Sequence, residues 1–126
     1  MKKRALVIAP GRGTYNKPEL GYLSRHHSDK SELIATLDNY RAVKGQTTIS
    51  DLDGRDTYAI KEHTRGDNAS PLIYGCAYAD FLSINRDAYD IVGVTGNSMG
   101  WYIALACAGA LSFDHALDLI NTMGGL

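Results

Sequence analysis

The stretch from Asp90 to Ala110 constrains the fold more than any other part of the sequence. A short apolar run rich in β-branched residues, 91–94, leads into the turn Gly96-Asn97-Ser98-Met99-Gly100, and an alanine- and leucine-rich run, 101–110, follows. This order predicts a buried strand, a sharp turn and a helix, which is the setting of a G-x-S-x-G nucleophile elbow. The free N–H groups at the start of that helix would favour an anion beside Ser98.

A second strand with a glycine loop lies at the start of the chain. Residues 5–9 form a continuous apolar run, which suits a parallel sheet that is covered on both faces. The loop Pro10-Gly11-Arg12-Gly13-Thr14-Tyr15 follows this run. Such a loop can present backbone N–H groups to an anion, but it lacks the lysine and the spacing of a phosphate-binding P-loop.

Three apolar-periodic segments predict further helices. They run from about 28 to 45, from Ser70 (an N-cap with Pro71 as the first helical residue) to about 85, and from Ser112 to 124–125. Residues 46–68 show no clear pattern. The sequence therefore predicts one α/β unit over residues 1–126, with a mostly parallel sheet built from the 5–9 and 91–94 strands and flanked by helices.

The composition excludes several function classes. The chain has 126 residues, is 44% hydrophobic and 21% charged, and carries a net charge of −1, which indicates neither nucleic-acid binding nor capture by an anionic membrane. No run is long enough to span a membrane, and the apolar run behind the basic start is too short for a signal peptide. Cys76 and Cys107 lie in helical patterns and are expected to be buried free thiols, which favours the cytoplasm. No cysteine and histidine cluster indicates a metal site.

The two glycine loops together resemble the N-terminal portion of the malonyl-CoA:acyl-carrier-protein transacylase family, which includes the acyltransferase domains of polyketide synthases. The family has P-G-Q-G-S-Q where this chain has Pro10–Tyr15, and G-H-S-L-G-E-Y where it has Gly96–Tyr102. The family's C-A-G-x-x-x-F-x-x-A segment is similar to Cys107–Ala116, and its Q-P-A-L helix start is similar to Ser70–Ile73. The resemblance covers almost the whole chain. It implies part of an α/β-hydrolase-like acyltransferase core, without the family's ferredoxin-like subdomain and C-terminal part.

The resemblance also implies a reaction and its residues. Ser98 matches the nucleophile that becomes the acyl-serine, and the backbone N–H groups of Arg12 and Met99 match the oxyanion-hole donors. The residues expected around the substrate are Gly11, Asn97, Trp101 and Met123. The implied reaction, in fatty acid or polyketide biosynthesis, moves an acyl group from a coenzyme A thioester to the thiol of an acyl carrier protein. It needs no permanently bound cofactor.

Three positions depart from the family pattern. Asn97 replaces the usual histidine, and Trp101 replaces the usual glutamate. Met123 stands where malonyl-selective members have the arginine of an M-R-G motif, which pairs with the substrate carboxylate. A carboxylate that loses its hydration needs a cation in return, so the sequence predicts no strong preference for malonyl unless Arg12, or an arginine outside these residues, takes that place.

No histidine of this chain matches the family's catalytic base, which lies well after the elbow in much longer proteins. His26, His27 and His63 are expected at the surface, and His115 on the solvent side of the last helix. We therefore expect the 126 residues alone to be inactive. They would be a fragment, a truncated reading frame, or half of a split enzyme completed by a complementary C-terminal segment.

Two other functions are compatible with the elbow. A serine hydrolase of the α/β-hydrolase type is one, although that fold places its oxyanion loop after a later strand. A non-catalytic fragment that only folds or binds a partner is the other, and the missing base favours it.

Overall fold

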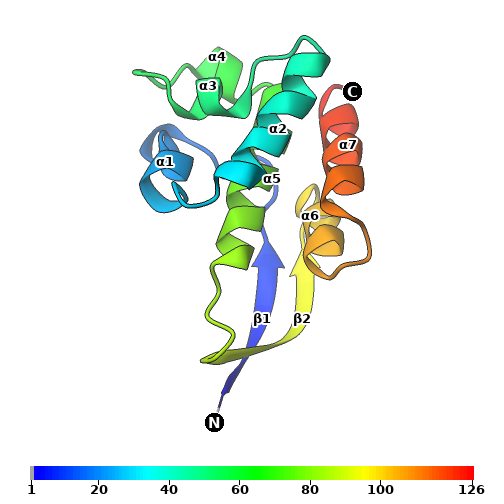
Figure 1. Cartoon of the computed structure of the whole chain (residues 1–126). Coiled ribbons are helices and arrows are strands. Elements are labelled where there is room, and N and C mark those ends of the chain that lie inside the picture. Colours follow the sequence, from blue (N-terminus) through cyan, green and yellow to red (C-terminus); the bar gives the residue numbers. More distant parts are fainter. Residues whose placement is uncertain (1) are drawn as a thin grey trace.

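The computed structural model describes residues 2–126 and has a two-stranded parallel sheet with helices packed against one face (Figure 1). Strands β1 (Lys3–Ala9) and β2 (Tyr89–Gly96) pair from Lys3↔Tyr89 to Ala9↔Gly96, with a register shift between Ala5 and Leu6. Both predicted strands and the α/β class are confirmed. Because parallel strands end at the same edge of a sheet, the glycine loop after β1 and the turn after β2 lie next to each other.

Helices make up most of the remaining chain. They are η1 (Lys17–Glu19, a 3-10 helix), α1 (Tyr22–His26), α2 (Ser31–Val43), α3 (Ile49–Asp53), α4 (Ile60–His63), α5 (Gly66–Leu82), α6 (Gly100–Cys107) and α7 (Phe113–Gly124). Helix α7 begins at its predicted N-cap, where the Ser112 hydroxyl accepts a hydrogen bond from the His115 N–H at 3.1 Å. Among residues 2–126, no helix combines the length and the apolar character that crossing a membrane requires.

Helix α5 begins five residues earlier than the sequence predicts, at Gly66 with Arg65 as its N-cap, so Pro71 lies inside it. Proline has no N–H, and this leaves the carbonyl four residues earlier, that of Asp67, without its helical partner. The fully buried Arg41 takes the place of that donor, because its Nη1 donates to the Asp67 oxygen at 2.5 Å. A side chain from α2 therefore allows the proline to lie within the helix rather than at its start.

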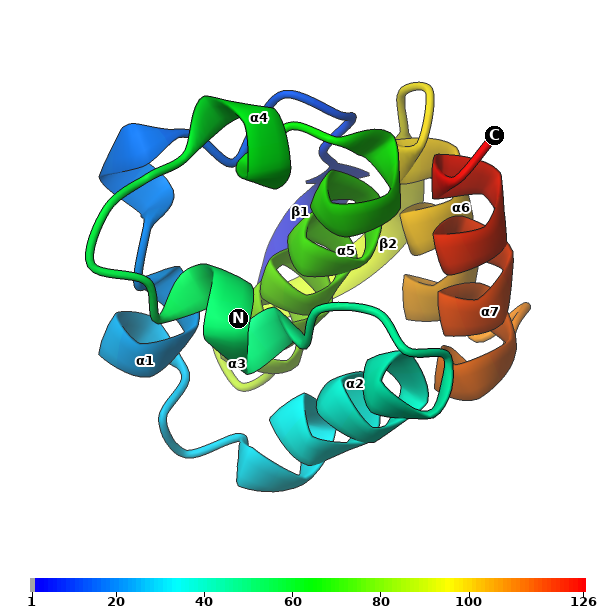
Figure 2. The ribbon, with the colours of Figure 1, turned by 90° about the horizontal axis from the view of Figure 1, so that it is seen from above.

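The hydrophobic core lies around α5. Figure 2 shows α5 in the middle of the molecule, with α2 and α3 on one side of it and α6 and α7 on another. Fully buried side chains from all five helices meet there, among them Leu37, Leu52, Leu72, Ile103 and Ile120. Helices α2 and α5 pack closely, since a Cβ placed on Gly75 would lie 2.8 Å from Leu37 Cδ1. Helix α6 joins this helical core to the sheet, because it contacts both β1 and β2.

The outer face of the sheet is not covered by the described residues. Leu6, Ile8 and Val92 are 58%, 70% and 60% exposed, whereas Ala9, which points to the other face, is buried. The expectation of a sheet covered on both faces is therefore wrong for residues 2–126. A continuous apolar run shows that a strand suits burial, but it does not show that its own chain buries both faces.

Candidate active site

The turn between β2 and α6 holds Ser98 in a strained backbone conformation. Its φ is 57°, and it is the one non-glycine residue among 2–126 with a positive φ. Such a conformation costs on the order of 1–3 kcal/mol, and it persists only where the surrounding structure enforces it. Ser98 is exposed, and the following Met99 is buried. The predicted strand, sharp turn and helix are therefore all present.

The glycines on either side of Ser98 allow strand and helix to approach each other. A Cβ placed on Gly96 would overlap the carbonyl of Gly100. A Cβ placed on Gly100 would overlap the carbonyl of Ala9, at the end of β1. Both positions therefore exclude any larger residue, and the elbow depends on close contact with the first strand as well as with its own.

The glycine loop after β1 lies directly against the elbow. A Cβ placed on Gly11 would lie 3.1 Å from the Asn97 carbonyl oxygen and 3.8 Å from Ser98 Cβ. Within residues 2–126, neither the Arg12 N–H nor the Met99 N–H donates a hydrogen bond. These two backbone donors are therefore without an acceptor, in a loop and a turn that lie against each other.

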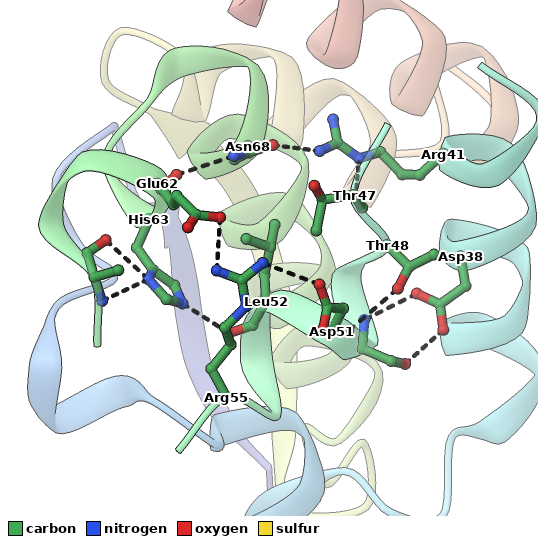
Figure 3. A network of polar contacts seen from close by, with 12 residues as sticks. Asp38, Arg41, Thr47, Thr48, Asp51, Leu52, Arg55, Glu62, His63 and Asn68 are labelled. Carbon is green, nitrogen blue, oxygen red and sulfur yellow. Dashed lines mark hydrogen bonds and ion pairs between the residues drawn. The ribbon is translucent and has the colours of Figure 1, made fainter. Parts of the chain in front are cut away.

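His63 is not a surface residue as expected, because it is fully buried. Its Nε2 donates to the Leu52 carbonyl at 2.7 Å, and its Nδ1 accepts from the Ala59 N–H at 3.0 Å (Figure 3). The Tyr58 ring stacks on it at 4.8 Å. With both nitrogens occupied, His63 joins α3 to α4 and has no nitrogen left to accept a proton from a serine.

His27 is also buried, at 3% exposure. The prediction that His27 lies at the surface is therefore wrong. Its Nε2 lies 2.7 Å from Asp80 Oδ1. His27 follows α1 and Asp80 lies in α5, so this contact links the two segments. His26 and His115 are exposed, as predicted. In the part of the chain that the structure describes, no side chain forms a hydrogen bond with the Ser98 hydroxyl.

The end of α7 brings Arg12 and Met123 into one neighbourhood. A Cβ placed on Gly66 would lie 2.5 Å from the Gly124 carbonyl oxygen and 3.2 Å from Arg12 Nη1. The Arg12 guanidinium therefore lies near the point where the start of α5 meets Gly124 at the end of α7, and Gly124 follows Met123 in the sequence. Met123 is 43% exposed. The side chain that the sequence suggested as a replacement cation thus lies near the same end of α7 as Met123.

Two cavities lie near this region. One, of about 310 Å³, is lined by Arg12, Tyr15 and His63. The other, of about 330 Å³, is mainly apolar and lies between β1 and α5. The residues predicted around the substrate line neither cavity: these are Gly11, Asn97, Trp101 and Met123. Trp101 is 55% exposed.

The described residues contain no group of three or more histidine, cysteine or acidic side chains that could hold a metal ion. Both cysteines are free thiols, but they are partly rather than fully buried, which corrects the expected burial. Burial raises the pKa of Cys107 to about 11 and that of Cys76 further, so neither is set up as a nucleophile. Ser98 is therefore the nucleophile candidate with the best surroundings.

The chain has two parallel strands, each followed by a glycine loop, and a strained serine at the end that the strands share. These features assign the chain to the α/β folds of the acyltransferase type. More narrowly, the chain has the fold of the N-terminal portion of malonyl-CoA:acyl-carrier-protein transacylases, and the predicted resemblance is confirmed. No protein-family model matches the sequence, and no curated protein matches it.

Three solved structures illustrate the similarity. An acyl-carrier-protein S-malonyltransferase from Burkholderia pseudomallei is 27% identical with a TM-score of 0.73, over 97% of this chain and 38% of its own. A malonyl-CoA:acyl carrier protein transacylase from Helicobacter pylori is 25% identical with a TM-score of 0.72, over 98% and 38%. A malonyl-transacylase in complex with its polyketide-synthase acyl carrier protein is 22% identical with a TM-score of 0.74, over 98% and 38%. The chain thus spans well under half of each.

Proposed function

We propose that this chain carries the nucleophile of an acyltransferase that moves an acyl group from a coenzyme A thioester to the thiol of an acyl carrier protein. The observation that carries the proposal is Ser98, at φ 57°, with the Gly11 loop against it and with no acceptor for the N–H groups of Arg12 and Met99. The names of the similar structures support the reaction class, and the malonyl-transacylase bound to its acyl carrier protein supports the acceptor.

The proposed reaction has two similar steps. Ser98 Oγ attacks the thioester carbonyl, its proton passes to a base, and the negative oxygen of the intermediate accepts hydrogen bonds from the Arg12 and Met99 N–H groups. The carbon–sulfur bond then breaks, and coenzyme A leaves with a proton. In the second step the carrier-protein thiol attacks the acyl-serine, and Ser98 recovers its proton. No permanently bound cofactor takes part.

The base in this scheme comes from outside residues 2–126. An unassisted serine hydroxyl is a poor nucleophile, and no described side chain forms a hydrogen bond with Ser98. We propose that a complementary C-terminal segment supplies the base, either as a continuation of the same polypeptide or as a separate one. The same proposal places the protein in the cytoplasm, because its two free thiols suit a reducing compartment.

The test compares this chain alone with a completed version. The completed version joins residues 1–126 to the part of the Burkholderia malonyltransferase that follows the matched region. After incubation with acyl-CoA, intact-mass analysis should show one acyl adduct on the completed version and a negligible amount on the chain alone. Loss of the base in such systems costs several orders of magnitude. The adduct should disappear in Ser98→Ala.

Two results would overturn this function. The first is robust acyl transfer by the 126-residue chain alone, and the second is an adduct that survives Ser98→Ala. Release of the acyl group by water as fast as by a carrier-protein thiol would instead assign the protein to the serine hydrolases.

A further inference from the structure

The glycine loop that follows β1 is held at both of its ends. At its start, the Ala9 carbonyl lies so close to Gly100 that a Cβ placed there would overlap it. At its end, Tyr15 is buried, and its hydroxyl donates to Asp53 Oδ1 at 2.6 Å. The Tyr15 carbonyl accepts a hydrogen bond from the Tyr58 hydroxyl at 3.2 Å. Contacts with the elbow and with residues 53–58 therefore fix where the loop begins and ends.

Between these ends, the shape of the loop depends on its own side chains. The chain turns at residues 12–13, with Gly13 at φ 91°, but in the described chain no backbone–backbone hydrogen bond of good geometry closes this turn. Instead, the Thr14 hydroxyl donates to the Gly11 carbonyl at 3.1 Å. The Asn16 side-chain amide donates to the Gly13 carbonyl at 2.9 Å. Two side chains thus do what backbone groups do in an ordinary turn.

The bond from Thr14 also fixes a group that it does not touch. The Gly11 carbonyl and the Arg12 N–H belong to one peptide unit, and no peptide bond among residues 2–126 is cis. In a planar trans peptide these two groups point in opposite directions. Because Gly11 has no Cβ to restrict rotation on its side of the peptide, the Thr14 hydroxyl is the contact that selects one orientation.

The orientation of this peptide matters for chemistry at Ser98. A Cβ placed on Gly11 would lie 3.8 Å from Ser98 Cβ, so the peptide starts from the part of the loop that approaches the serine. The Arg12 N–H has no acceptor within residues 2–126. If the peptide turned over, its carbonyl oxygen would point where the N–H now points. An N–H stabilises an oxyanion, whereas a carbonyl oxygen repels it.

We infer that Thr14 is a positioning residue for acyl transfer. Its hydroxyl holds the Gly11 carbonyl, and this leaves the Arg12 N–H on the opposite side of the peptide for the oxyanion. The inference rests on the proposed function. It adds to that function the residue that sets one of the two backbone donors, and Thr14 does this through the peptide, without a hydrogen bond to Ser98.

The first measurement is kinetic and uses the completed version, in which residues 1–126 are joined to the part of the Burkholderia malonyltransferase that follows the matched region. Thr14→Val removes the hydroxyl and keeps the shape of the side chain, whereas Thr14→Ser keeps the hydroxyl. Asn16→Ala is the matched control, because it removes a bond of the same kind from the Gly13 carbonyl, whose peptide does not carry the Arg12 N–H. Thr14 and Asn16 are exposed, so all three variants should melt within a few degrees of the parent.

We expect Thr14→Val to lower kcat by at least about fivefold, the equivalent of one ordinary hydrogen bond. Complete loss of an oxyanion donor, at about 100- to 1,000-fold, is the upper limit. The KM for acyl-CoA should stay within twofold, because the same donor serves both half-reactions and they slow together. Thr14→Ser and Asn16→Ala should both keep kcat within twofold of the parent.

The second measurement follows the peptide itself and needs no activity. Residual dipolar couplings of the isotope-labelled 126-residue chain report the direction of the Arg12 N–H. This direction should change in Thr14→Val. It should remain that of the parent in Thr14→Ser and Asn16→Ala.

The inference is overturned if Thr14→Val keeps the kcat of the parent or the parent's Arg12 N–H direction. It is also overturned if Thr14→Ser or Asn16→Ala loses as much activity as Thr14→Val. The two measurements separate this inference from the proposed function. A completed parent that never acylates Ser98 contradicts the function, and the dipolar couplings then still decide whether Thr14 orients the peptide. Normal acylation of Ser98 in Thr14→Val contradicts the role of Thr14 and leaves the function in place.

Discussion

Arg12 combines two features that can be tested apart: a backbone N–H without an acceptor, in the loop against Ser98, and a guanidinium near Gly66, where α5 meets the end of α7. A substrate carboxylate that enters a desolvated site needs a cation, and a methionine at the position proposed for the family's arginine carries no charge. An uncompensated charge costs several kcal/mol, far more than the ~1 kcal/mol at stake per methylene. We therefore predict that the completed enzyme prefers malonyl-CoA over acetyl-CoA by less than a hundredfold in kcat/KM.

Arg12→Gln is the control for that prediction. It keeps the backbone N–H, so transfer from acetyl-CoA should stay within a few fold of the parent. The ratio of malonyl to acetyl kcat/KM should also be unchanged. A hundredfold preference for malonyl in the parent that collapses in Arg12→Gln would contradict the prediction and identify the Arg12 guanidinium as the carboxylate partner.

Among the helices, α5 depends on a residue outside itself. Arg41 is fully buried and donates to four acceptors, namely Thr47 O, Asp67 O, Asn68 Oδ1 and Asn121 Oδ1. Figure 3 shows Arg41 with Thr47 on one side and Asn68 on the other. Removal of the guanidinium leaves these buried oxygens unsatisfied. We predict that Arg41→Met lowers the free energy of unfolding by about 3–5 kcal/mol.

A double-mutant cycle with Pro71→Ala tests the reason for that loss. Alanine restores an N–H that can donate to the Asp67 carbonyl when Arg41 is absent. Pro71→Ala should therefore cost less in the Arg41→Met background than in the parent, with a coupling of about 1 kcal/mol by urea unfolding. Additive losses would show that the Asp67 carbonyl is not what links the two residues.

Helix ends could be predicted from the sequence only where the residues that fix them lie in or next to the helix itself. Helix α7 has its N-cap hydroxyl and its final glycines within its own sequence, so both ends were predictable. The start of α5 was not, because Ser70-Pro71 is a sound local start signal that Arg41, 30 residues away, overrides. Likewise His63 is held by Leu52 and Ala59, within a region where no periodic pattern exists.

The first turn of α5 also predicts how stability depends on pH. Hydrogen bonds from Arg65, at 2.6 Å and 3.1 Å, hold the pKa of Asp67 below its ordinary value. The folded state thus favours the carboxylate, so the stabilisation is present above the unfolded pKa near 4 and is lost as the pH falls through the folded pKa.

Because Arg65 is largely exposed, the effect should be about 0.5 kcal/mol. Asp67→Asn should lower stability by that amount at pH 7 and not at pH 2, as measured by urea unfolding at both values. An equal loss at pH 2 would mean that the substitution acts through packing rather than through charge.

On the scale of the whole molecule, the chain is a sheet with helices against one face. The apolar runs of both strands were enough to predict the sheet and its parallel pairing. They could not predict that the described residues leave Leu6, Ile8 and Val92 bare, because burial of a strand depends on what packs against it. The strained Ser98 turn was predictable for the opposite reason: Gly96 and Gly100 encode it locally.

A bare sheet face also has a thermodynamic consequence. A segment that docks on the folded sheet binds the native state and not the unfolded chain, so it stabilises the native state by RT ln(1 + [L]/Kd). At a hundredfold excess over Kd this amounts to about 2.7 kcal/mol. For a domain of this size we predict a rise in Tm of roughly 5–15 °C on addition of the complementary segment, measured by calorimetry.

The rise should grow with the concentration of the segment and vanish in Ile8→Lys, on the bare sheet face. A control variant, Val43→Lys, at an 88% exposed position at the end of α2, should retain it. The Ile8→Lys variant alone should melt close to the parent, since a side chain that is 70% exposed contributes little to the stability of the isolated chain. A complex that forms without raising Tm would mean that the segment binds the unfolded chain as well as the folded one. In that case the sheet face is not a preformed surface, and coupled folding of the two segments creates the interface.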